Sequence, residues 1–148
     1  MNIAIIPARS GSKRIKNKNI KLFFGKPIIY WTITAAKNSK IFDRIIVSTN
    51  SKKIAKISVD CGAEVPFLRS NKLSDDKTNI ADVVRDVLKN LTKIKQKPKY
   101  ACLLYATSPL ININDLKSGY IKIKNKNLDF VNSISKFDSQ YFRALKIK

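Results

Sequence analysis

Histidine is absent from this chain of 148 residues, and cysteine occurs only twice. The absence of histidine excludes a Ser-His-Asp triad and every metal site that uses an imidazole ligand. Cys61 and Cys102 are far apart and show no CxxC spacing, so the sequence gives little support for a disulfide or a thiolate metal site. Any chemistry must therefore come from carboxylates, hydroxyls, amides and cations.

Acidic residues are scarce, since 10 Asp and Glu stand against 30 Lys and Arg, for a formal net charge of +20. Such a charge favours nucleic acid, an anionic membrane surface or phosphorylated small molecules as partners. Lysine supplies most of it and is spread, with Asn and Ile, over nearly every expected helix and loop, which indicates a drift in composition more than a binding stripe. Basic residues do not alternate with aromatic ones on any expected strand, so we expect no nucleic-acid partner and no membrane partner.

Long apolar runs are also missing. None approaches the roughly 20 residues needed to span a bilayer, and the N-terminus enters an apolar strand without a signal-peptide pattern. We therefore expect a cytoplasmic protein. The length suits one domain with its own hydrophobic core, so a single domain is expected over residues 1–148.

Short apolar segments alternate with amphipathic ones along the chain. Strands are expected at residues 3–6, 45–48, 63–68, 100–106 and 129–135. Helices are expected after Pro27 and after caps at Ser51, Thr78 and Asn114. The third helix has the clearest apolar face, formed by Ile80, Val83, Val84, Val87, Leu88 and Leu91. The alternation predicts an α/β fold, a three-layer and mostly parallel twisted sheet with helices on both faces.

The segment from residue 7 to 26, PARSGSKRIKNKNIKLFFGK, directly follows the first apolar strand. It brings hydroxyls, backbone N–H groups and cations to the carboxyl edge of the sheet, where open α/β sheets bind ligands. The residues concerned are Arg9, Ser10, Gly11, Ser12, Lys13 and Arg14. The segment has neither the Gly-Lys-Ser/Thr ending of a P-loop nor the three glycines of a dinucleotide fingerprint. It predicts a phosphate-binding loop in a different nucleotide fold, although a charge run is also typical of a solvated loop.

Several motifs, in their order and spacing, resemble the acylneuraminate cytidylyltransferase family. They are PARSGSKRIKNKNI, GKPII, FDRIIVSTN, GAEVPFLR, LSDDKT and YATSPL, and the resemblance runs from Met1 to about Lys148. At YAT, where sialic acid synthetases have Gln in place of Tyr105, and at the closing FRALKI, the chain is most similar to the pseudaminic acid cytidylyltransferases. The resemblance implies a Rossmann-like nucleotide-diphospho-sugar transferase fold. It also implies transfer of CMP from CTP to a nonulosonic acid, a nine-carbon keto-sugar acid, with release of pyrophosphate.

The resemblance implies roles for particular residues as well. Arg9 and Lys18 would act in catalysis, Lys18 by neutralising charge as pyrophosphate leaves. Arg143 would bind the sugar acid. The nucleotide-binding positions implied are Arg9, Ser10, Gly11, Ser12, Lys13, Asn19, Arg69, Thr78, Asn79, Tyr105, Ala106, Thr107 and Ser108.

Some of these residues have a purely structural interpretation too. Thr78 serves equally well as a helix cap, and Tyr105 fits a packed core position with its hydroxyl satisfied. Lys18 and Asn19 also fit exposed positions in a chain rich in Lys and Asn. Arg69 is either a ligand for phosphate or a base carbonyl, through its planar fork, or a surface arginine.

Mg²⁺ is the cofactor that the resemblance implies. Asp75 and Asp76 are adjacent carboxylates, but neighbouring residues of an extended segment point to opposite faces, so we do not expect both to ligate one ion. The family's metal-binding carboxylates lie in a later Asp-x-Asp segment, and this sequence has no such pattern. No metal ligand is therefore assigned to this chain.

Members of the family are longer, and the resemblance implies that this chain lacks the C-terminal part. That part supplies the metal carboxylates, some of the sugar pocket and the arm through which two subunits pair, so a homodimer is expected only of a full-length form. Three interpretations stay open: a piece of a longer gene product, a split enzyme, or a degenerate paralogue that binds nucleotide without turnover.

The function implied by the resemblance is CMP-pseudaminic acid synthesis. A CMP-sialic or CMP-legionaminic acid synthetase is the alternative within the same enzyme class. An inactive nucleotide-binding module is the alternative outside it, favoured by the missing Asp-x-Asp pattern. An RNA-binding domain is favoured by the net charge alone.

Overall fold

A computed structural model describes residues 1–126 and 128–134. Its centre is a parallel sheet in the order β4, β1, β5, with β1 at Asn2–Pro7, β4 at Arg44–Ser48 and β5 at Tyr100–Leu103. In register, Ile5 of β1 lies opposite Ile46 of β4 and Leu103 of β5. Both edges of β1 are paired because it is the central strand, and buried clusters cover both of its faces, which explains its nearly continuous apolar run.

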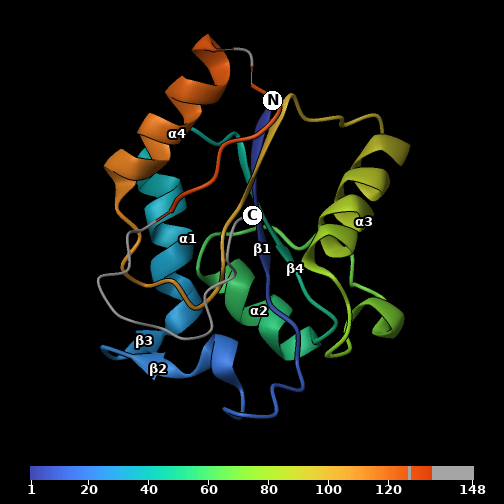
Figure 1. The fold of residues 1–148 in the computed structure, drawn as a ribbon. Helices are drawn as coiled ribbons and strands as arrows, with labels where there is room; N and C mark the ends of the chain where they lie inside the picture. The colour runs from blue at the N-terminus through green and yellow to red at the C-terminus, as the bar shows by residue number, and fades with distance from the viewer. Residues whose placement is uncertain (127, 135–148) are drawn as a thin grey trace, which may run out of the picture.

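Helices lie on both sides of this sheet (Figure 1): α1 at Ile28–Ser39, α2 at Lys52–Asp60, α3 at Ile80–Lys93 and α4 at Ile113–Asn125. Ala4 and Ile6 of β1 belong to one buried cluster, together with apolar residues of α1 and α2, and α4 packs against it. Ile3 and Ile5 belong to a second cluster with Val87 and other residues of α3. Alternate residues of β1 therefore contact opposite layers, and the predicted three-layer α/β fold is confirmed.

One predicted helix cap is confirmed and two are wrong. The cap of α2 is Ser51, as predicted, and its hydroxyl accepts the backbone N–H of Ile54. The cap of α3 is Asn79, whose side-chain oxygen accepts the N–H of Ala81 at 2.9 Å, so the prediction of a cap at Thr78 is wrong. The Thr78 hydroxyl instead donates to Asp75.

The start of α4 also lies further upstream. Asn112 is its cap, with the side-chain oxygen accepting the N–H of Asn114 at 2.8 Å, so the prediction of a cap at Asn114 is wrong. Both asparagines have the short polar side chain that favours this position. Asn112 has the extended backbone that a cap requires, whereas Asn114 lies within the helix.

Three of the expected strands are shorter than predicted or absent. Residues 63–68 make one isolated bridge, between Glu64 and Ile46, because Pro66 has no N–H to continue a ladder. β5 ends at Leu103, and the chain then turns at Ala106 and Thr107. Residues 129–134 do not form a strand, and residue 135 lies outside the described residues.

Short elements connect β1 to α1. A 3-10 turn, η1, covers Lys18–Ile20, and a small hairpin pairs β2 (Leu22–Phe23) with β3 (Lys26–Pro27). The hairpin turn at Phe24 and Gly25 has positive φ at both residues, as tight two-residue hairpins require. No helix within the described part of the chain is both long and apolar enough to cross a membrane.

Candidate functional site

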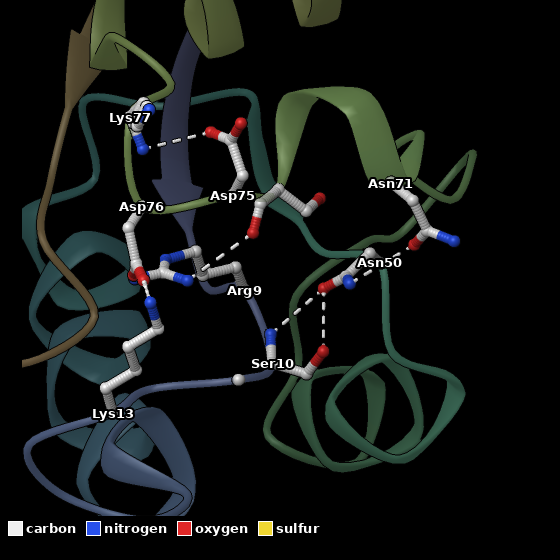
Figure 2. Close-up of a pocket in the computed structure, with 10 residues that line it drawn as sticks. Arg9, Ser10, Lys13, Asn50, Asn71, Asp75, Asp76 and Lys77 are labelled. Atoms are coloured by element: carbon white, nitrogen blue, oxygen red, sulfur yellow. Dashed lines mark hydrogen bonds and ion pairs between the residues drawn. The ribbon is translucent and has the colours of Figure 1, made fainter.

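Two neighbouring cavities lie at the carboxyl end of the parallel sheet. The inner cavity, of about 540 Å³, extends from Pro7 at the end of β1 to Tyr105 after β5. The outer cavity, of about 580 Å³, is more open and extends over Asn50, which follows β4 (Figure 2). The predicted phosphate-binding loop, residues 9–14, contributes to the walls of both. This is the crevice in which open α/β sheets bind ligands.

The loop after β1 has a defined shape. Gly11 has φ +75°, a conformation that L-residues rarely adopt, and this allows the tight turn between Ser10 and Ser12. Asn50 fixes the start of the turn, because its side-chain oxygen accepts both the N–H and the hydroxyl of Ser10, at 2.9 and 3.2 Å. Sequence reasoning missed Asn50, which lies forty residues from Ser10. Its place after a buried strand, within STN, was the signal that could have found it.

Asn19 supports the same loop from the other side. It is only 7% exposed, and its amide nitrogen donates to the carbonyl oxygen of Arg9 at 3.0 Å. The interpretation of Asn19 as an exposed residue is therefore wrong. Lys18, by contrast, is exposed and lines the inner cavity at the start of η1.

Arg69 is a buried cation on the wall of the inner cavity. Its side chain is 5% exposed, so the interpretation as a surface arginine is wrong. Nε donates to the hydroxyl of Ser74 at 3.1 Å, whereas Nη2 has no hydrogen-bond partner among the residues that the structure describes. Burial lowers the pKa of Arg69, and the positive charge of Arg9 lowers it further. A buried, incompletely paired guanidinium of this kind calls for an anion or a carbonyl oxygen.

Asp75 and Asp76 have different partners. Asp75 accepts the N–H and the hydroxyl of Thr78, both at 2.6 Å, and the N–H of Lys77 at 3.0 Å, and the hydroxyl bond is the main cause of its lowered pKa. Asp76 pairs with Lys13 and Arg9, which lower its pKa in that order. Each carboxylate is thus satisfied by groups of its own.

These carboxylates do not form a metal site. Within residues 1–126 and 128–134, no group of three or more Asp, Glu or Cys side chains lies close enough together to hold one ion. Asp76 is neutralised by cations on both of its oxygens, which is the opposite of an environment that attracts Mg²⁺. The described residues therefore do not fit a protein-bound Mg²⁺.

The loop after β5 closes the inner cavity on the side of α1. Tyr105, Ala106 and Thr107 line this cavity, and Tyr105 is 57% exposed, so the interpretation of Tyr105 as a packed core residue is wrong. The fully buried hydroxyl of Thr32 lies 3.1 Å from the Tyr105 carbonyl oxygen and 3.3 Å from that of Ser108. Sequence reasoning missed Thr32 because a helix residue gave no local sign of this contact.

Most of the residues singled out in the sequence come together here. The inner cavity is lined by Arg9, Ser12, Lys13, Lys18, Asn19, Arg69, Thr78, Tyr105, Ala106 and Thr107, and the outer cavity adds Ser10 and Gly11. Asn79 and Ser108 line neither of these two cavities. Arg143 lies outside the described residues.

The fold of this chain is also found in solved structures. The solved structure of CMP:2-keto-3-deoxy-manno-octonic acid synthetase in complex with CTP superposes on it with a TM-score of 0.71, over 85% of this chain and 48% of that one, at 19% identity. At that identity the likeness shows the fold alone. A family model described as cytidylyltransferase matches residues 3–148, and the chain belongs to this family.

Curated relatives agree with this assignment. A pseudaminic acid cytidylyltransferase of Campylobacter jejuni strain 81-176 is 41% identical over 143 residues, which cover 97% of this chain and 62% of the relative. A CMP-N,N'-diacetyllegionaminic acid synthase of Legionella pneumophila is 46% identical over 110 residues, covering 72% of this chain and 46% of the relative. The chain thus spans less than two thirds of the length of either relative.

Proposed function

We propose that this chain is the nucleotide-binding domain, residues 1–148, of a cytidylyltransferase that transfers CMP from CTP to a nonulosonic acid, with pseudaminic acid as the first candidate. The observation that carries the proposal is Arg69, a buried guanidinium on the wall of the inner cavity, which the phosphate-binding loop also lines. One nitrogen of this guanidinium has no partner among the described residues. The names of the relatives supply the nucleotide and the class of sugar.

In the proposed reaction the anomeric hydroxyl oxygen of the sugar acid attacks the α-phosphorus of CTP. The bond from the α-phosphorus to the bridging oxygen breaks, pyrophosphate leaves with that electron pair, and the hydroxyl proton passes to solvent. Catalysis of this kind depends on positioning and on neutralising charge. Arg9, Lys13 and Lys18 are the cations lining the inner cavity that suit the leaving pyrophosphate.

The base of the nucleotide would meet the loop after β5. Backbone groups of Tyr105 and Ala106 sit at the end of a sheet strand, where the donor and acceptor pattern of a pyrimidine edge can be read by fixed groups. The hydroxyl of Thr32 in α1 holds this loop by donating a hydrogen bond to the carbonyl oxygen of Tyr105. A fixed backbone pattern favours cytosine over a purine, which is larger.

Mg²⁺ dependence remains part of the proposal at the level of the family, and no step is assigned to the metal. The described carboxylates do not fit a protein-bound ion. Adding EDTA to the assay tests whether the reaction depends on Mg²⁺. Loss of activity with EDTA would support the family's use of a divalent ion.

The direct test is pyrophosphate release by the purified chain. The proposal predicts release only when CTP, Mg²⁺ and pseudaminic acid are all present, with ATP in place of CTP as the negative control. If CTP binds but no pyrophosphate is released with pseudaminic, legionaminic or sialic acid, the purified chain is not a transferase by itself and acts as a nucleotide-binding module.

Legionaminic acid is the second candidate for the sugar. It is favoured by the identity with the Legionella pneumophila synthase, which is higher than that with the Campylobacter jejuni enzyme but extends over fewer residues. Comparing the rates of pyrophosphate release with the two sugar acids at equal concentration decides between them.

A further inference from the structure

The carboxylate of Asp76 bridges two cations of the phosphate-binding loop. One of its oxygens pairs with the guanidinium of Arg9, and the other lies 2.6 Å from Nζ of Lys13. Figure 2 shows the three side chains pointing toward one another, with Asp76 coming from the loop before α3. Arg9 also donates to the carbonyl oxygen of Ser74 in that loop, at 3.4 Å.

This cluster stands between the two cavities. Arg9, Lys13, Asp75 and Asp76 line both of them, so the cluster forms a shared wall. The inner cavity is also lined by Arg69, and the outer cavity by the Ser10–Gly11 turn and Asn50. Two cations of the phosphate-binding loop are therefore already paired with one carboxylate of the chain itself.

Stability does not explain the cluster. Lys13 is 83% exposed, and Asp76 and Arg9 are about one third exposed, and ion pairs of that kind add little to folding. The chain has only 10 Asp and Glu among 148 residues, yet Asp76 pairs with two cations of the phosphate-binding loop. A carboxylate offers two anionic oxygens to two cations in the same manner as a phosphate group.

We propose that the Asp76 carboxylate occupies a phosphate subsite between Arg9 and Lys13, and that the polyphosphate of the nucleotide displaces it and joins the two cavities into one site. The inference rests on the proposed function in taking the incoming anion to be a nucleotide polyphosphate. The two anions exclude each other, because a carboxylate and a phosphate at the same pair of cations would repel.

The displacement lowers the apparent affinity for nucleotide, since only the fraction of molecules with Asp76 released is competent to bind. This factor is the same for every ligand that needs Asp76 released, so CTP and inorganic tripolyphosphate should be affected alike. Removing the carboxylate should raise affinity about fivefold, the factor expected from the upper range of an exposed ion pair.

The test is calorimetric titration of CTP and of inorganic tripolyphosphate into the wild-type chain, Asp76→Asn and Asp82→Asn. Asp82 is the matched control, because its loss changes the net charge equally but it pairs with Arg85 and lines neither cavity. We expect both ligands to bind Asp76→Asn about fivefold more tightly than wild type, and Asp82→Asn to bind like wild type. Asp76→Ser repeats the measurement should Asp76→Asn fold poorly.

The outcomes separate the two proposals. CTP affinity that is equal or weaker in Asp76→Asn would overturn the role of Asp76 and leave the proposed function intact. Tighter binding of tripolyphosphate by Asp76→Asn, with no CTP binding by either protein, would establish the subsite and overturn the proposed function. Failure of both ligands to bind the folded wild-type chain and Asp76→Asn would overturn both.

Discussion

The hydroxyl of Thr32, buried in α1, lies 3.1 Å from the carbonyl oxygen of Tyr105 in the loop after β5. The carbonyl oxygens of Ala106 and Ser108 lie at 3.5 and 3.3 Å from the same hydroxyl. One side chain of a core helix thus fixes the turn that forms a wall of the inner cavity. A residue behind the site therefore helps to set the position of that wall.

Replacing Thr32 with Val keeps the shape of the side chain but removes the hydroxyl that donates to the loop after β5. We expect a loss of about 1–2 kcal/mol in the free energy of unfolding, together with weaker CTP binding and poorer discrimination between CTP and UTP. Thr32→Ser, which retains the hydroxyl, should restore both. Urea unfolding and calorimetry measure the effects, and unchanged discrimination in the Val variant would show that Thr32 does not position the loop.

Arg69 should be essential for nucleotide binding through the fork of its guanidinium. Arg69→Lys keeps a charge but loses the planar pair of donors. Because hydrogen bonds to charged groups contribute about 1.5–3 kcal/mol each, we expect CTP affinity to fall by at least tenfold. Arg85→Lys, at an exposed position on α3, is the control and should leave affinity unchanged. A CTP affinity equal to wild type in Arg69→Lys would remove Arg69 from the site.

Replacing Gly11 should lower the free energy of unfolding because of its backbone conformation and not because of a steric clash. A Cβ at Gly11 would meet no atom within 4 Å, but its φ of +75° is unfavourable for alanine by about 1–2 kcal/mol. Gly119 in α4 has equally open surroundings without a positive φ, so Gly119→Ala should instead stabilise by about 0.5–1 kcal/mol. Thermal unfolding of the two variants compares them, and equal shifts would contradict the assigned backbone strain.

Asp75 should titrate below the ordinary carboxyl range, because the Thr78 hydroxyl and the N–H groups of Thr78 and Lys77 stabilise its charged form and lower its pKa. A group whose pKa is lowered by folding contributes stability above its unfolded pKa, about 3.9, and loses that contribution as pH falls through the folded value. Carboxyl carbon NMR should therefore give Asp75 a midpoint below 3.9.

Thr78→Ala provides the internal check, since the Thr78 hydroxyl is the largest cause of the lowered pKa. In that variant the Asp75 midpoint should move upward toward the ordinary value. A midpoint that is already ordinary in the wild-type chain, or that does not move in the variant, would show that the turn before α3 is not held by Asp75.

The layered fold could be predicted from the sequence because its signals are local. Buried strands such as Ile3–Ile6 and the apolar face of α3 can be recognised from composition and spacing alone. The two wrong helix caps occurred where two nearby residues were equally suitable. Thr78 and Asn79 are both good caps, and the choice depends on Asp75, which engages the Thr78 hydroxyl.

The structure gathers the predicted phosphate-binding loop, Arg69 and the loop after β5 around one crevice. Their roles in binding stay predictions, which rest on the position of each segment after a strand and on the family resemblance. Two residues that support these segments were missed. Asn50 and Thr32 were missed because their roles consist of contacts with residues 40 and 73 positions away. The pairing of Asp76 with Arg9 was missed for the same reason, as it joins segments 67 residues apart.

Calorimetric titration of the purified chain with CTP, against ATP at the same ionic strength and with Mg²⁺ present, decides whether this crevice is a cytidine nucleotide site. We expect that CTP binds, that ATP does not, and that Arg9→Ala abolishes the CTP signal. Equal binding of both nucleotides, or no CTP binding by a chain shown to be folded, would contradict this expectation.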